Sequence, residues 1–188
     1  KKHFSNNGAI KPSPIISTLG ILKNGTKITK SGFVNDNDIV YLLGIDNIEL
    51  NIESLHGSEY ENYFYKSVTG IPEINLDKEK ILQDTNRELI NKGLINSAND
   101  CSDGGLLVTL LEKCFLGDKG FEFTINLNNN NLIPTLFGEV NSRIVISISS
   151  NNEKKLLNHL DQSSLPYIKI GKVKSDDFII TQKFSLNL

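Results

Sequence analysis

Residues 97–106 read Ser-Ala-Asn-Asp-Cys-Ser-Asp-Gly-Gly-Leu, and this stretch decides how the chain is interpreted. The apolar residues before it predict a strand over 94–98, and the polar and glycine residues predict a tight turn over 99–105. The apolar run 106–116 that follows predicts a buried helix. A strand that bends into a helix aims backbone N–H groups and the positive helix end at one point, which suits a phosphate group.

The acidic residues of this turn suggest a metal ion beside the phosphate. Carboxylates beside a phosphate suit Mg²⁺, which takes oxygen ligands. On that interpretation Asp100 is a magnesium ligand, and the phosphate-binding residues are Ser102, Asp103, Gly104 and Gly105. The same residues also have a structural interpretation, in which Asp100, Ser102 or Asp103 caps the helix and the glycines allow close packing. Residue types alone favour the structural one, because the turn matches neither a Walker loop nor GxGxxG.

A second polar segment lies at 136–143, with the sequence Leu-Phe-Gly-Glu-Val-Asn-Ser-Arg. It places Glu139, Asn141, Ser142 and Arg143 just before a predicted strand. These side chains could bind a polar substrate. They could equally form a turn in which Arg143 pairs with a carboxylate.

A third segment, His56-Gly-Ser-Glu-Tyr60, has the same two interpretations. A Gly-Ser turn followed by Glu and Tyr could contact a ligand. Alternatively Ser58 could be the N-cap of a helix, because a serine hydroxyl accepts hydrogen bonds from the first helical N–H groups.

The rest of the chain alternates predicted strands and helices, which indicates an α/β or α+β domain with a mixed sheet. Residues 1–14 are predicted to be an irregular lead-in from a preceding domain, and residues 15–188 a single domain. The expected elements are a β-prone run at 15–22, a buried strand at 38–45, a partly helical connection at 46–71, an amphipathic helix at 78–92 capped by Asp77 and ended by Gly93, a strand at 121–127, a polar loop at 128–131, a strand at 143–149, a helix opened by a capping box of Ser150 and Glu153, and strands at 167–173 and 178–181.

Composition excludes several classes of protein. The 188 residues carry a net charge of -2 with mixed signs, and a nucleic-acid surface would show a clustered basic patch. No stretch approaches the ~20 apolar residues of a membrane span. Cys101 and Cys114 have no CxxC spacing and are expected to be free thiols. The chain has no methionine, and we therefore expect a fragment of a longer protein.

The three segments occur together with further motifs and in a fixed order. The matching stretches are 12–16 with 19–20, 38–44, 57–60, 74–79, 93–95, 97–106, 136–139 and 142–145. In this ordered set, from about residue 8 to the end, the chain resembles the C-terminal half-domain of phosphoribosylformylglycinamidine synthase. That family belongs to the aminoimidazole-ribonucleotide-synthetase-like superfamily. The Ser-Asp-Gly-Gly form of the turn resembles the second of the family's two pseudo-symmetric halves.

The resemblance implies a layered α+β fold that is partly ferredoxin-like, in a cytoplasmic ligase of purine biosynthesis. The family uses ATP to activate the formamide oxygen of formylglycinamide ribonucleotide, and glutamine-derived ammonia then displaces phosphate. It implies ATP or ADP with Mg²⁺ in the full enzyme, and no catalytic residue and no activity in this domain alone. Its implied partners are the preceding domains, a glutaminase domain or subunit, and a second copy through the sheet, with neither nucleic acid nor membrane.

The resemblance also implies roles for single residues. The family's aspartate that matches Asp100 binds metal in the catalytic half, and the triplet that matches Glu139-Val-Asn141 contacts substrate. This chain departs from the pattern at Asn99, where His is usual, at Val140 and Asn141, which replace a small residue and Gln, and at His56, which replaces Gly. Residues 1–6 lack the family's Asn and Ser ligands. We therefore interpret Glu139, Asn141 and Arg143 as relics of a substrate site.

Two alternatives stay open at this stage. The first is a structural half-domain that still binds a nucleotide around Asp100 and the two glycines. The second is the C-terminal domain of another superfamily member, such as a selenophosphate synthetase, a thiamine-phosphate kinase or a hydrogenase maturation factor. Those proteins differ at the Asp-Cys-Ser-Asp-Gly-Gly turn and lack the Gly-Ser-Glu-Tyr segment.

Overall fold

A computed structural model describes the backbone of residues 4–5, 8–9, 16–21, 28–175, 178–180 and 185–187. Side chains are described for 16–21 and for 28–175 except residue 129. The first strands, β1 (Phe4–Ser5) and β2 (Gly8–Ala9), pair with each other as a separate two-stranded sheet. The predicted irregular lead-in otherwise lies mostly outside the described residues.

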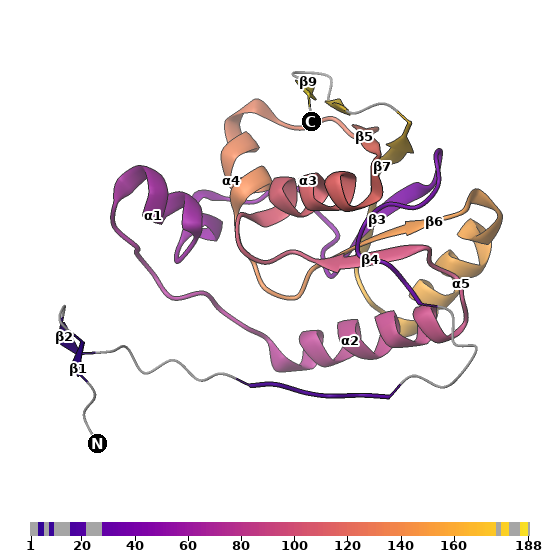
Figure 1. Cartoon of the computed structure of the whole chain (residues 1–188), viewed down its shortest axis with the longest axis horizontal. Coiled ribbons are helices and arrows are strands. Elements are labelled where there is room, and N and C mark those ends of the chain that lie inside the picture. The colour runs from indigo at the N-terminus through magenta and orange to yellow at the C-terminus, as the bar shows by residue number, and fades with distance from the viewer. Residues whose placement is uncertain are drawn as a thin grey trace.

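A seven-stranded sheet organises the body of the chain (Figure 1), in the spatial order β4-β6-β3-β7-β5-β8-β9. The pairs from β4 to β5 are antiparallel, β8 runs parallel to β5, and β9 is antiparallel to β8. The prediction of an α+β fold with a mixed sheet is confirmed. The strands are β3 (Ile39–Leu43), β4 (Ser97–Asp100), β5 (Gly120–Phe123), β6 (Ile144–Ile148), β7 (Tyr167–Lys174), β8 (Phe178–Ile180) and β9 (Ser185–Asn187).

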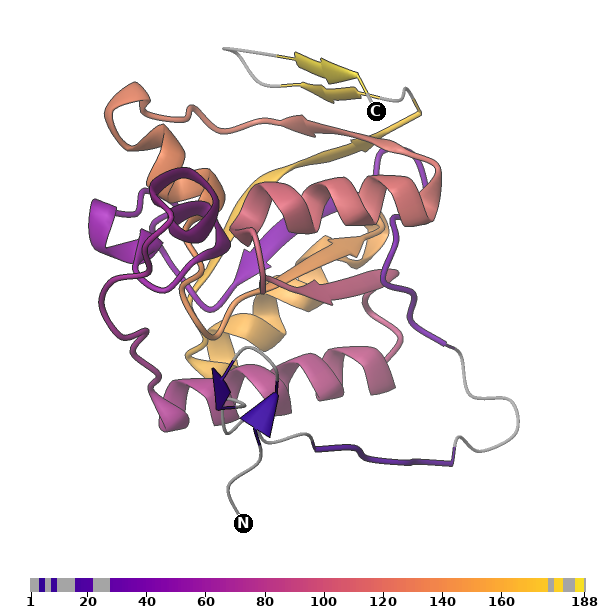
Figure 2. The same cartoon turned by 60° about the vertical axis from the view of Figure 1, so that its left-hand side comes forward.

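Helices cover both faces of the sheet, and Figures 1 and 2 show the resulting layers. The helices α3 (Gly105–Gly117) and α4 (Leu132–Phe137) pack on one face. The helices α2 (Leu76–Asn91) and α5 (Glu153–Ser163) pack on the other. A short helix, α1 (Glu59–Tyr65), and 3-10 turns at Ile52–Leu55, Asn129–Asn131 and Ser150–Asn152 complete the helical elements of the described residues.

The central strand β3 explains why the run at 38–45 has no polar alternation. Val40 and Leu42 belong to the core under α3, whereas Ile39, Tyr41 and Leu43 belong to the core above α2 and α5. All five are buried. A strand covered on both faces has no position for a polar side chain, so it reads as a continuous apolar segment.

The start of α2 corrects the predicted cap. The helix begins at Leu76, and its N-cap is Asn75 rather than Asp77. The Asn75 side-chain oxygen accepts hydrogen bonds from the backbone N–H groups of Asp77 and Lys78, at 3.1 and 3.0 Å. Asn and Asp are equally good caps, so the residue types did not distinguish the two positions. At the other end Gly93 has φ +63°, the left-handed conformation expected of it.

The prediction of a capping box between Ser150 and Glu153 at the start of α5 was wrong. Ser150 lies in a 3-10 turn capped by Ser149, whose side chain accepts from Asn151 N. The Glu153 carboxylate instead accepts hydrogen bonds from Tyr41 Oη and Lys169 Nζ, each at 2.7 Å. Glu153 therefore bonds to side chains of β3 and β7, and not to the backbone N–H at the helix start that the spacing predicts.

Other boundaries differ from the sequence prediction. The strand predicted at 94–98 forms at 97–100, the strand at 121–127 is shorter, and the supposed loop at 128–131 leads into α4. Helix α3 is not buried all round, because Phe115 and Leu116 are 64% and 69% exposed. The described part of the β-prone run, residues 16–21, forms no regular element.

Candidate functional site

The turn after β4 takes the bend that the sequence predicts. Residues 101–104 connect Asp100 to the first residue of α3, and Gly105 N donates to Ser102 O at 3.0 Å. Gly104 and Gly105 have φ +81° and +69°, where other residues are strained. The N-cap is Gly104 itself, without a side-chain cap bond, so the prediction of Asp100, Ser102 or Asp103 as cap was wrong.

The Glu139 carboxylate occupies the mouth of this helix. Its Oε1 atom accepts hydrogen bonds from the backbone N–H groups of Gly104 and Glu59, both at 2.8 Å. Glu59 opens α1, and Ser58 is the N-cap of that helix, as its structural interpretation predicts. The three candidate segments therefore meet at one carboxylate. An internal anion takes the position at α3 that the sequence suggested for a phosphate.

Arg143 stabilises the loop that carries Glu139. It is 2% exposed, and its guanidinium donates to Val140 O at 3.0 Å and to Gly138 O at 2.6 Å. Its partners are carbonyl groups of its own loop, so the predicted pairing with a carboxylate was wrong. Burial lowers the pKa of this guanidinium below its usual value.

The remaining polar groups of this loop bond to the α2 region. Asn141 Nδ2 donates to Glu73 O at 2.8 Å, and Ser142 Oγ donates to Glu79 Oε2 at 2.6 Å. Ser142 takes φ +61°, which is uncommon for a non-glycine residue. These bonds fix the 138–143 loop between the start of α3 and the start of α2.

A pocket of about 370 Å³ lies between the turn after β4 and the loop that carries Glu139. Its lining includes Asp100, Ser102 and Asp103 from the turn, and Glu139, Asn141 and Arg143 from the loop. Gly104 and Gly105 lie beside it rather than in its lining. Sequence reasoning did not place Pro72, Ile74 or Glu79 there, although 74–79 was among the matching motifs.

The charges of this pocket are unfavourable for a bare phosphate. Glu79, Asp100, Asp103 and Glu139 supply carboxylates, and the one guanidinium in the lining is already bonded to carbonyl groups. A phosphate would approach several like charges, so its binding there requires a cation. Within the described residues no group of three or more His, Cys, Asp or Glu side chains is arranged to hold a metal ion.

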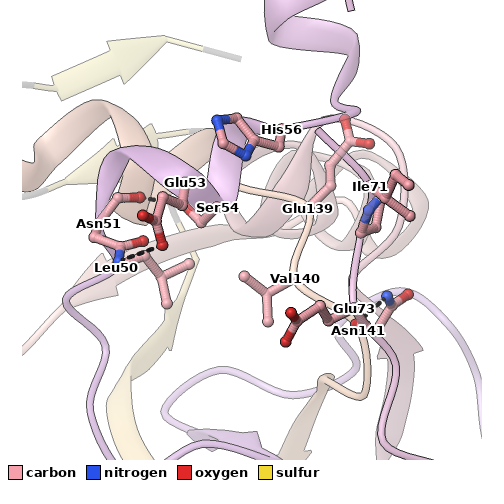
Figure 3. Close-up of a pocket in the computed structure, with 11 residues that line it drawn as sticks. Leu50, Asn51, Glu53, Ser54, His56, Ile71, Glu73, Glu139, Val140 and Asn141 are labelled. Carbon is pink, nitrogen blue, oxygen red and sulfur yellow. Dashed lines mark hydrogen bonds between the residues drawn. The ribbon is translucent and has the colours of Figure 1, made fainter. Parts of the chain in front are cut away.

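A neighbouring pocket of about 320 Å³ shares Pro72, Glu139 and Asn141 with the first. Figure 3 shows Asn51 and Glu53 on one side of it and Glu73 with Asn141 on the other. It too is lined by more acidic than basic side chains. The acidic surface around Glu139 therefore extends over both pockets.

Cys101 and Cys114 are both buried free thiols, as expected. Burial raises the pKa of Cys101, and it raises that of Cys114 to about 12, so neither is a thiolate near neutral pH. Among the residues that the structure describes, no helix has the length and hydropathy that a membrane span requires.

The layered sheet, the glycine turn and the loop around Glu139 define a synthetase-type C-terminal domain, and comparison of the sequence confirms this class. Residues 35–182 match the family described as AIR synthase related protein, C-terminal domain, and the chain belongs to that family. Its relatives within the family include phosphoribosylformylglycinamidine synthase subunit PurL of Prochlorococcus marinus, 36% identical over 180 residues. The same subunit of a Synechocystis species is 34% identical over 165 residues.

The chain is much shorter than these relatives. The matches cover 95% and 87% of this chain but only 23% and 21% of the two PurL sequences. Solved structures share the fold. PurL of T. maritima complexed with FGAR gives a TM-score of 0.66 at 17% identity, covering 85% of this chain and 28% of that one. Thiamine-monophosphate kinase of Stenotrophomonas maltophilia gives 0.57 at 12% identity, covering 86% and 54%.

Proposed function

We propose that this chain is the C-terminal domain of an ATP-dependent phosphoribosylformylglycinamidine synthase, a cytoplasmic ligase of purine biosynthesis. The observation that carries the proposal is the 36% identity to a PurL subunit over 95% of the chain. The likeness to thiamine-monophosphate kinase is one of fold alone, at 12% identity. The sequence relatives therefore favour the synthase over other members of the superfamily.

The domain contributes structure to the enzyme rather than reacting groups. Glu139 is bonded to two backbone N–H groups, and Arg143 is bonded to two carbonyl oxygens. Groups bonded in this way hold the 138–143 loop in place. The preceding domains would supply the residues that activate the formamide oxygen and receive ammonia.

The wider enzyme would bind ATP or ADP with Mg²⁺ and take ammonia from a glutaminase domain or subunit. Structures of T. maritima PurL with ATP and with ADP, and one of an assembly named PurLQS, are consistent with this assignment. The resemblance assigns Asp100 of this domain to Mg²⁺, but the described residues offer no group of three or more His, Cys, Asp or Glu side chains to hold the ion. A second copy of the enzyme would join through the sheet. Sedimentation of the full-length protein measures whether it forms such a dimer.

A turnover assay tests the proposal directly. The full-length enzyme that contains this chain should hydrolyse ATP in the presence of formylglycinamide ribonucleotide and an ammonia source. The 188-residue chain alone should show no such hydrolysis. Absence of this activity from the full-length enzyme would overturn the assignment, and turnover by the isolated chain would overturn the structural role.

The pocket that joins Asp100, Ser102 and Asp103 to the Glu139 loop favours one second candidate, a nucleotide-binding half-domain. Calorimetry of the 188-residue chain with Mg-ADP separates the two. We expect no heat at millimolar ligand, because a carboxylate already occupies the helix mouth. Micromolar binding that is lost in Asp100→Asn and kept in Asp46→Asn, a control on the exposed surface, would establish the second candidate instead.

A further inference from the structure

Residues 16–21 form an apolar segment outside the layers of the domain. Their sequence is Ile-Ser-Thr-Leu-Gly-Ile, without a charged residue. Ile16, Leu19 and Ile21 are 87%, 102% and 99% exposed. Figures 1 and 2 both show this segment as an extended stretch away from the sheet. No hydrogen bond joins it to another described residue.

The attachment of the chain to its own sheet begins later. Lys30 forms a parallel bridge with Ser97, and Lys30 O accepts a hydrogen bond of 2.9 Å from Ala98 N. Phe33 is buried against α3, and its N–H donates to Lys113 O at 2.9 Å. Among the described residues, 16–21 therefore precede the first contact of the chain with the sheet, at Lys30.

The family match also begins after this segment. The family model for the C-terminal domain begins its match at residue 35. The match to the P. marinus subunit covers 95% of the 188 residues, which leaves only about nine unmatched, so it must include residues 16–21. The segment is thus shared with the longer enzyme but lies outside the domain that the family model describes.

We propose that residues 16–21 are a strand that pairs with the edge of a β-sheet in the preceding part of the same enzyme. Ile16, Thr18 and Ile21 favour an extended backbone, and Ile16, Leu19 and Ile21 have apolar surface to bury. The unpaired N–H and C=O groups of such a segment are satisfied by the edge of another sheet. The six residues span roughly 20 Å, the length of an ordinary strand.

The partner is the same polypeptide rather than a second copy. The relatives are about four times as long as this chain, which covers 23% of one of them, so most of such an enzyme lies outside it. A sheet in that part is held near by covalent connection, which gives an effective concentration that a separate molecule does not reach. This inference rests on the proposed function only in that the chain continues into a larger enzyme.

Hydrogen exchange measured by mass spectrometry tests the proposal. In the full-length enzyme, amides of 16–21 should exchange more than about 100-fold more slowly than in the 188-residue chain. Peptides from β3 (Ile39–Leu43) serve as an internal control and should be protected in both proteins. Equal, fast exchange of 16–21 in both would overturn the proposal. Protection in the 188-residue chain that grows with its concentration would overturn it in favour of a second copy.

Variants of the full-length enzyme provide a second measurement. Leu19→Asp should restore fast exchange across 16–21, because a carboxylate cannot be buried in the partner's apolar surface. Leu19→Val is the matched control and should keep the protection. If the full-length enzyme lacks synthase turnover but protects 16–21, the proposed function fails and the strand pairing stands. If 16–21 exchange fast in an enzyme with normal turnover, the strand pairing fails and the proposed function stands.

Discussion

The Oε1 atom of Glu139 lies 2.8 Å from the backbone nitrogen of Gly104, at the start of a thirteen-residue helix. The same oxygen accepts the N–H of Glu59. A carboxylate in this position satisfies donors that a helix leaves unpaired and interacts favourably with the helix dipole. The chain thus supplies from its own sequence the anion that comparable turns take from a phosphate.

Removal of this carboxylate should destabilise the domain. Glu139→Ala leaves the N–H groups of Gly104 and Glu59 without their acceptor, and we expect a loss of about 1–3 kcal/mol in the free energy of unfolding. Glu139→Gln should lose less, because an amide oxygen still accepts both bonds but without the charge. Urea denaturation monitored by circular dichroism measures both. Unchanged stability of Glu139→Ala would show that the two hydrogen bonds contribute nothing.

The glycines of the chain offer a graded test of the turn. At Gly105 a Cβ atom would lie 2.7 Å from Gly138 O, and φ is +69°. At Gly93 φ is +63° but nothing lies within 4 Å, and at Gly20 nothing lies within 4 Å and no such φ applies. Gly93→Ala should therefore cost about 1–2 kcal/mol from backbone strain. Gly105→Ala should cost more, and Gly20→Ala should be neutral.

Thermal unfolding of the three variants measures the order of their losses in stability. The contact with Gly138 is a backbone contact, so it cannot be relieved by rotation of a side chain. Equal losses at Gly93 and Gly105 would mean that the 138–143 loop moves aside at no cost.

The parts of the fold that could be predicted are those fixed by local sequence. The glycine pair at 104–105 predicts the bend from β4 into α3, and the apolar run around β3 predicts a strand buried on both faces. The contacts of Glu139 could not be predicted from local patterns, because they join residues 35 and 80 positions apart. The order of the three motifs indicated a family, but nothing in the sequence placed these segments at one site.

The failed prediction of the α2 cap has another cause. Asn75 and Asp77 are both suitable caps, and residue types do not distinguish them. Helix α4 was missed because a run of asparagines and Pro134 both disfavour a helix, yet Pro134 lies in its first turn, where a missing N–H is tolerated.

The hydrogen bond between Tyr41 and Glu153 makes a third prediction. Tyr41 is 3% exposed, and its hydroxyl donates to Glu153 Oε1 at 2.7 Å, so burial raises its pKa. Tyr41→Phe should lower stability by about 1.5–3 kcal/mol, because the bond has a charged acceptor. Tyr167→Phe is the matched control, since its hydroxyl bonds to Asp161 in an exposed position, and it should change stability by less than about 0.5 kcal/mol.

A double-mutant cycle with Glu153→Ala isolates the pair, because alanine leaves no acceptor for the Tyr41 hydroxyl. Non-additivity of about 0.5 kcal/mol or more is expected if the two side chains interact directly. Additive losses would place the effect of Tyr41→Phe in core packing and not in the hydrogen bond.

Lys113 is buried without an acidic partner. It is 0% exposed, and its ammonium donates to Ser31 O at 2.8 Å and to Ser97 Oγ at 2.9 Å, with the Phe33 ring centroid 5.1 Å away. None of the salt bridges among the described residues involves it. Burial lowers its pKa to about 7, an effect that the nearby thiols of Cys101 and Cys114 partly oppose.

This burial makes stability depend on pH with a defined sign. Between pH 7 and the ordinary pKa of lysine near 10.4, the unfolded chain keeps the proton and the folded chain does not. The unfolded state then binds more protons, so stability rises with pH, by up to about 1.4 kcal/mol per pH unit for one group. Above about pH 8.5, the ordinary pKa of a thiol, the raised pKa values of Cys101 and Cys114 act in the opposite direction.

The difference between the unsubstituted chain and Lys113→Met, measured between pH 7.5 and 8.5, isolates Lys113, because the thiols contribute equally to both proteins. The unfolding free energy should increase by about 1 kcal/mol over this interval through this one group. Lys113→Met keeps most of the apolar stem and should remove that increase. Lys154→Met, on the exposed surface of α5, should retain it. The same slope in Lys113→Met as in the unsubstituted chain would show that Lys113 stays protonated in the folded state.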